Sequence, residues 1–199
     1  MADVAQSVPS PLAGLNLASE PEVARLAEGP ARARLVLRAN PATVARLLQW
    51  ADVAVPPRIN TARVTEQRVV LQLGPDEWWI LSAGETPAAL SHIVTQSAGG
   101  AAYSLVDVSD RTIGLILAGP AVEDVLASGC PLPLSLPACP VGRATRTLFA
   151  KAEIVLWRQA LDRFHLEVGR SFAPYVAALL GSAIREEAAL RRWRGDTTV

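Results

Sequence analysis

The chain has 199 residues, 19 basic and 19 acidic side chains, two His, two Cys and a hydrophobic fraction of 50%. A formal net charge of zero argues against sequence-independent nucleic-acid binding, which needs an excess of positive charge. The apolar fraction excludes a disordered chain, and the length allows a full core without disulfides or metal. Two cysteines in a chain of this length make no disulfide framework.

The N-terminus predicts a cytoplasmic protein, because MADVAQSVPSP has neither the basic stretch nor the apolar stretch of a secretory signal. Two long uncharged stretches, 86–106 and 125–142, need testing as membrane spans. The first is interrupted by polar residues and a Gly pair, and the second contains four prolines. We therefore expect neither to cross a membrane.

Residues 1–33 are punctuated by four prolines, which predicts an extended N-terminal arm. One helical turn is expected within this arm, around residues 21–27.

The first half of the body begins with a polar–apolar alternation over 33–39 that predicts a strand. Asn40 and Pro41 then predict a helix start, as N-cap and first helical residue, and the helix should end near Trp50. Three further strands are expected at 62–65, 68–73 and 77–81, and a second helix should open at Thr86 and Pro87.

The second half predicts strands at 103–108 and 112–117, followed by a helix that starts at Gly119 and Pro120. A proline-rich loop over 129–142 leads to strands at 146–150, 153–158 and 163–168. The last helix should open at Ser171 and bury one apolar stripe. The residues expected in that stripe are Phe172, Tyr175, Val176, Leu179, Leu180, Ala183 and Ile184.

The two halves are similar in pattern. In 34–48 and in 112–126, a predicted strand is followed by a dipeptide that ends in Pro and then by a predicted helix. In 76–84 and in 162–169, an Asp is followed two residues later by an aromatic residue, and the segment ends at a Gly. We predict an α+β fold of two fused β-α-β-β-α halves, with helices on mixed or antiparallel sheet and an extra strand before the second half. The predicted organisation is one domain over 34–190, with repeats at 34–97 and 101–190, and a basic C-terminal tail over 191–199.

The usual catalytic and metal-binding patterns are missing from the sequence. His92 and His165 lie far apart without any H-x-x-x-H or C-x-x-C spacing, which predicts structural histidines and no metal site. Cys130 and Cys139 lie in the proline-rich loop, where Arg143 is the nearest cation by sequence, so packing is the favoured role.

The densest polar cluster is V-D-V-S-D-R-T at 106–112, which holds Asp107, Ser109, Asp110 and Arg111. A Ser–His–Asp arrangement with either histidine would need a nucleophile elbow such as G-x-S-x-G, which is absent. The cluster therefore predicts a tight turn between strands. No catalytic residue is assigned.

Trp78 and Trp79 are adjacent on a predicted strand, so they should point to opposite faces, one into the core and one exposed. Trp79, together with Arg191 and Trp193 at the C-terminus, is a candidate for a protein interface. The candidates for a ligand pocket are Asp76, Trp78, Asp107 and Arg111. No glycine-rich nucleotide loop is present.

Segment 106–126 resembles a recurrent segment of the glycine-cleavage aminomethyltransferase superfamily, and the whole body resembles the gamma subunit of heterotetrameric sarcosine oxidase. The pieces that carry the second resemblance occur in order from residue 10 to about 190. They are S-P-L-A-G-L (10–15), G-P-D-E-W-W-I-L (74–81), V-D-V-S-D-R-T (106–112), C-P-L-P-L (130–134), V-G-R-A-T-R-T-L (141–148) and F-H-L-E-V-G-R-S-F-A (164–173).

The resemblance implies an accessory subunit without catalytic residues of its own. Its partners would be the alpha, beta and delta subunits of a complex that oxidatively demethylates sarcosine to glycine, with hydrogen peroxide and, from tetrahydrofolate, methylene-tetrahydrofolate as further products. FAD, FMN and NAD would then belong to the two larger subunits, and zinc to the smallest. The alternative is a free-standing folate or pterin binder of the aminomethyltransferase type, with contacts from Asp76, Trp78, Asp107 and Arg111.

Overall fold

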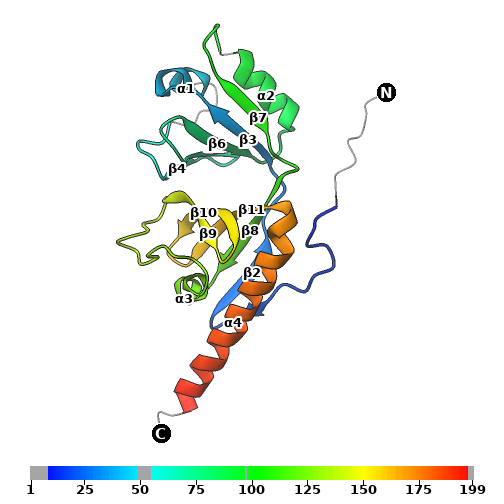
Figure 1. Ribbon diagram of the computed structural model, residues 1–199, viewed down its shortest axis with the longest axis vertical. Coiled ribbons are helices and arrows are strands. Elements are labelled where there is room, and N and C mark those ends of the chain that lie inside the picture. The colour runs from blue at the N-terminus through cyan, green and yellow to red at the C-terminus, as the bar shows by residue number, and fades with distance from the viewer. Residues whose placement is uncertain (1–8, 49–54, 97, 197–199) are drawn as a thin grey trace.

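The computed structural model describes residues 9–48, 55–96 and 98–196. Two antiparallel sheets stack face to face, and helices cover the outer face of each sheet (Figure 1). The predicted α+β class with helices packed on antiparallel sheet is confirmed.

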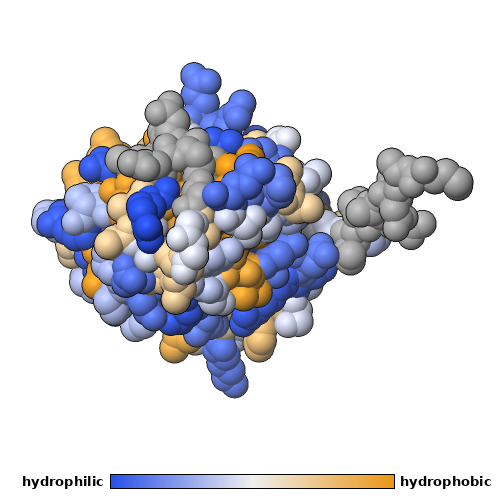
Figure 2. All heavy atoms as spheres, turned by 90° about the horizontal axis from the view of Figure 1, so that it is seen from above, coloured by the Kyte–Doolittle hydropathy of each residue, from blue (hydrophilic) through white to orange (hydrophobic). Residues whose placement is uncertain are grey.

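The sheet formed mainly by the first half, sheet B, has five strands. Their spatial order is β4 (Thr61–Val64), β5 (Arg68–Gln72), β6 (Glu77–Ser82), β3 (Ala33–Arg38) and β7 (Ser104–Asp107). Helices α1 (Pro41–Leu47) and α2 (Pro87–Gln96) pack on its outer face. Figure 2 shows this end of the molecule from above, where hydrophilic residues dominate and apolar ones form small scattered groups.

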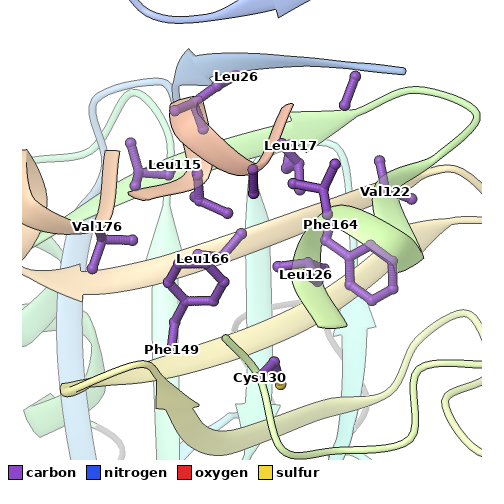
Figure 3. Packing of buried hydrophobic residues seen from close by; sticks show 14 of the residues in the cluster. Leu26, Leu115, Leu117, Val122, Leu126, Cys130, Phe149, Phe164, Leu166 and Val176 are labelled. Carbon is purple, nitrogen blue, oxygen red and sulfur yellow. The ribbon is translucent and has the colours of Figure 1, made fainter. Parts of the chain in front are cut away.

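Sheet A has six strands. Their order is β1 (Ser19–Glu20), β2 (Ala24–Glu28), β8 (Thr112–Ala118), β11 (Arg163–Gly169), β10 (Ala152–Ala160) and β9 (Ala144–Phe149). Its outer face is covered by α3 (Val122–Ala127) and by α4 (Ala173–Asp196), which follows a short 3-10 turn over Arg170–Phe172. Figure 3 shows the largest apolar cluster, in which Leu115 of β8 lies on the side of Val176 of α4, and Phe164 of β11 lies beside Leu126 of α3.

The start of α1 follows the predicted capping chemistry. The Asn40 side chain accepts a hydrogen bond from the Thr43 N–H at 2.9 Å, and Pro41 occupies the first helical turn. Strands β6 and β10 are buried on both faces, which fits their largely apolar sequences and not a polar–apolar alternation. The predicted end of this helix near Trp50 lies outside the described residues.

The expected helical turn at 21–27 is wrong. Residues 24–28 form β2, in which buried Ala24 and Leu26 alternate with exposed Arg25, and the strand pairs with β8 in sheet A. This alternation is a strand period, and prolines at 21 and 30 only bracket it. The segment expected as an extended arm therefore supplies two strands to the core sheet.

The C-terminal helix differs from the prediction at both ends. Phe172 and Tyr175 are 48% and 38% exposed, because Phe172 precedes the helix and the two rings pack edge to face on its outer side. The rest of the stripe packs against sheet A, with Leu179 only partly buried. Residues 191–196, expected as a tail, continue α4 as helix.

Among the described residues, no helix combines the length and the apolar character that crossing a membrane requires.

The internal repeat is visible in the strand orders. From β3 to α2 and from β8 to α4 each half reads β-α-β-β-β-α, which keeps the three individually predicted strands between the helices and has one strand more than the predicted repeat pattern β-α-β-β-α. The orders 4-5-6-3-7 and 9-10-11-8-2 correspond strand for strand. The strand that precedes each half is exchanged, since β2 joins the sheet of the second half and β7 joins the sheet of the first. The boundaries 34–97 and 101–190 stay a prediction.

Candidate functional site

A cavity of about 1020 Å³ lies between the inner faces of the two sheets. Sheet B contributes Val36 and Trp79 to its wall, and sheet A contributes Val155 and Glu167. Phe172 lies at its rim, in the turn before α4. Its volume is at the upper end of the range for small-molecule sites.

Glu77 is the centre of an ion-pair network on the cavity wall. Its carboxylate accepts hydrogen bonds from Arg38 at 2.8 Å, from the Trp79 indole N–H at 3.1 Å, and from Arg146. Arg146 also pairs with Glu153 at 2.8 Å, and its guanidinium carbon lies 5.9 Å from the Trp79 ring centroid. Because Glu77 lies on β6 and Arg146 on β9, the network joins the two sheets.

A second charged cluster lies deeper between the sheets. Arg34 Nε donates to Glu167 Oε2 and His165 Nε2 donates to Glu167 Oε1, both at 2.7 Å, and all three side chains are buried. Burial by itself would raise the pKa of the Glu167 carboxyl, but the contacts with His165 and Arg34 outweigh it and lower that pKa. The cluster is therefore a buried ion pair extended by a histidine.

The space for the His165 ring exists because the residue opposite Glu167 on β8 is a glycine, Gly114. A Cβ built on Gly114 would lie 2.7 Å from His165 Cε1 and 3.1 Å from His165 Nε2. On its other side the imidazole packs against the Trp157 ring, with 5.8 Å between centroids. His165 Nδ1 is buried without a hydrogen-bond partner within the described residues.

The polar segment 106–112 forms the tight turn that the sequence predicts, between β7 of sheet B and β8 of sheet A. The Ser109 N–H donates to Asp107 Oδ1 at 2.9 Å, and Ser109 Oγ accepts from the Arg34 N–H at 2.9 Å. The turn thereby places Asp110 and Arg111 on the cavity wall. The Arg111 guanidinium makes no ion pair or hydrogen bond within the part of the chain that the structure describes.

The model of the sarcosine oxidase, gamma subunit family matches residues 37–186. The chain belongs to this family. A gamma subunit of sarcosine oxidase from Arthrobacter sp. is 36% identical over 105 residues, which span 50% of this chain and 48% of that one. The corresponding subunit from Corynebacterium sp. strain U-96 is 32% identical over 156 residues, 77% of this chain and 75% of that one.

Solved structures agree with the family assignment. A chain of the heterotetrameric sarcosine oxidase from Corynebacterium sp. U-96, in complex with pyrrole 2-carboxylate, matches with a TM-score of 0.82 and 27% identity over 91% of this chain and 96% of that chain. The glycine cleavage aminomethyltransferase from Bartonella henselae shares the fold, with a TM-score of 0.59 and 15% identity over 79% of this chain and 45% of that chain.

In this gamma-family chain, the four predicted pocket residues do not come together. Only Arg111 lines the cavity. Asp76 lies in the exposed β5–β6 turn beside Arg38, and Asp107 is exposed and bonded within its own turn. Trp78 is fully buried on the outer face of sheet B under the helices, so it does not reach the cavity.

The expectation that one of the adjacent tryptophans is exposed is also wrong. Trp79 is 7% exposed because it faces sheet A across the cavity, and it is not available as a surface anchor. Of the other interface candidates, Arg191 pairs with Glu187 at 2.8 Å and with Asp124 of α3 at 3.4 Å. Trp193 is 65% exposed near the end of α4. Their role in an interface stays a prediction.

The sequence analysis missed the charged residues on the inner faces of the strands. A usable signal was present in R-L-V-L-R at 34–38 and H-L-E at 165–167, where charged side chains occupy one face of a largely apolar strand. Of the remaining candidate groups, His92 is exposed on α2 and bonded to Gln96, and both cysteines are buried free thiols. Burial raises the pKa of the Cys139 thiol. No group of three or more potential metal ligands occurs in the described ranges.

Proposed function

We propose that this chain is the accessory gamma subunit of a heterotetrameric sarcosine oxidase and docks on its alpha, beta and delta subunits. The single observation that carries the proposal is the structural match along 96% of a chain from such a complex. In the proposed assembly the chain has a structural role, and oxidation of an N-methyl amino acid takes place on the partners.

The cavity chemistry supports a structural role for the inner charges. Glu167 accepts from Arg34 and Glu77 accepts from Arg146, and each of these pairs joins strands of different halves. Within one sheet, Glu77 also pairs with Arg38 and Glu153 pairs with Arg146. Carboxylates held this way stabilise a fixed arrangement of the sheets. FAD, FMN, NAD and zinc are proposed to reside on the partner subunits, and the complex is proposed to be cytoplasmic, as the family resemblance implies.

Co-expression tests the proposal. A tagged copy of this chain should co-purify with the alpha, beta and delta subunits of the same organism in equal stoichiometry, and the complex should oxidise sarcosine with release of hydrogen peroxide. The chain alone should show no such activity. If the other three subunits assemble into a fully active enzyme while this chain elutes separately, the proposal is wrong.

A second candidate function is folate or pterin binding in the cavity. It is favoured by one observation. The guanidinium of Arg111 lines the same cavity as Trp79 and has no ion-pair or hydrogen-bond partner among the described residues. Titration with tetrahydrofolate, followed by tryptophan fluorescence, should then give a saturable change that Arg111→Gln weakens and that Arg25→Gln, at an exposed site outside the cavity, leaves unchanged. A flat titration excludes this function without affecting the first.

A further inference from the structure

The β4 edge of sheet B and the β9 edge of sheet A meet along a line that we call the seam. The seam is far in sequence from the turn at 106–112 that lines the cavity. Thr61 of β4 forms an antiparallel bridge with Arg143, just before β9. The Ala62 N–H donates to the Gly142 carbonyl at 2.8 Å, and the Ala144 N–H donates to the Asn60 carbonyl at 3.1 Å. The loop before β4 and the proline-rich loop before β9 are therefore held side by side.

A groove of about 450 Å³ runs along this seam. It is lined by residues 57–63 on one side and by residues 137–138 and 140–143 on the other; we call it the seam groove. It shares no lining residue with the cavity between the sheets.

The seam groove carries a local excess of positive charge. Arg58, Arg63 and Arg143 line it, and no acidic residue is among its lining residues. None of the three guanidinium groups makes an ion pair or a side-chain hydrogen bond within the described parts of the chain. This differs from the cavity, where Arg38 and Arg146 are paired with carboxylates. Three unpaired guanidinium groups in a formally neutral chain favour a ligand with several carboxylates.

Apolar side chains lie among these arginines. Ile59 and Val141 are 43% and 49% exposed, and prolines 57, 137 and 140 add rigid apolar surface. The turns are fixed by left-handed backbone at Asn60 (φ 65°) and Gly142 (φ 88°). Arginine combined with exposed apolar surface on a fixed backbone is the composition of a protein-binding surface, and binding to a preformed groove costs little ordering.

We propose that the seam groove binds an extended acidic segment of a partner polypeptide. Carboxylates of this segment pair with Arg58, Arg63 and Arg143, and an apolar side chain between them packs on Ile59 and Val141. A small anion would use only part of this surface, because the arginines come from both sides of the groove and apolar groups lie between them. The inference goes beyond the gamma-subunit assignment and does not depend on it.

Fluorescence anisotropy with a synthetic probe tests the proposal on the full chain. The probe is a fluorescein-labelled peptide Glu-Glu-Ile-Glu-Glu, compared with Gln-Gln-Ile-Gln-Gln. We expect saturable binding of the acidic peptide only, which weakens several-fold when NaCl is raised from 50 to 300 mM because exposed charges are screened. The triple variant Arg58→Gln, Arg63→Gln, Arg143→Gln should weaken it at least tenfold.

The matched control removes the same charge elsewhere, with Arg25→Gln, Arg46→Gln and Lys151→Gln at exposed positions outside the seam groove. This control should bind the acidic peptide as the unmodified chain does. Equal loss in both triple variants would show attraction to net charge alone and overturn the proposal. Displacement of the peptide by citrate at equal concentration would assign the groove to small anions and overturn it as well. Ile59→Ser, which keeps all three charges, should weaken binding several-fold and identifies the apolar contact.

Discussion

Arg34 and Glu167, 133 positions apart in sequence, form a 2.7 Å ion pair that is buried between the two sheets. Arg34 lies on β3 and Glu167 on β11, so the pair links the central strands of opposite halves. Removing one partner leaves a buried charge without compensation, whereas replacing both with apolar groups removes that cost.

Glu167→Ala should therefore lower the free energy of unfolding by about 3–5 kcal/mol, since Arg34 would remain buried and unpaired. The double variant Arg34→Met, Glu167→Leu should be more stable than Glu167→Ala alone. Urea denaturation followed by circular dichroism measures both. A double variant that is less stable than the single one would contradict the interpretation.

The lowered pKa of Glu167 predicts a pH dependence with a definite sign. The folded state holds fewer protons than the unfolded state, so this group stabilises the fold above its ordinary pKa, and the contribution is lost as the pH falls below about 4.5 and through the folded value. The difference in unfolding free energy between the unmodified chain and Glu167→Gln should shrink as the pH is lowered into that range. A difference that grows on acidification would reverse the sign and refute the prediction.

Gly114→Ala should destabilise the fold by about 1–3 kcal/mol, because the added Cβ would lie 2.7 Å from the His165 ring and force a shift in a packed region. Gly169→Ala is the matched control. Gly169 also lies in sheet A, but a Cβ there meets no atom within 4 Å and its φ is −55°. Thermal denaturation should separate the two variants, and equal melting temperatures would show that the space over Gly114 is not required.

Asn40→Ala should cost about 1 kcal/mol of stability, because the Thr43 N–H at the start of α1 would lose its acceptor. Asn40→Asp, which keeps a side-chain oxygen at the same place, should retain most of the stability. The comparison uses chemical denaturation of both variants. If both lose the same amount, the cap does not contribute through its side-chain oxygen.

The helices, strands and turns of residues 34–190 could be predicted because each depends on a short sequence pattern within the element itself. Alternation identified β3, the Asn–Pro pair identified the start of α1, and the turn at 106–112 followed from its Asp and Ser residues. The cavity could not be predicted, because it depends on which strand faces turn toward each other. Trp79 and Glu77 become cavity residues only when β6 stacks on the other sheet. For the same reason Trp78, its chemically identical neighbour, is a core residue under the helices.

The exchange of β2 and β7 between the sheets has a consequence for how the chain can be divided. A cut at 98–101 would release two pieces that each hold a strand of the other's sheet, so neither piece could complete its own sheet. The topology is that of a homodimer whose protomers swap their first strand and are then joined into one polypeptide. We therefore expect each half to need the other for its complete sheet, and the two repeats to unfold as one cooperative unit.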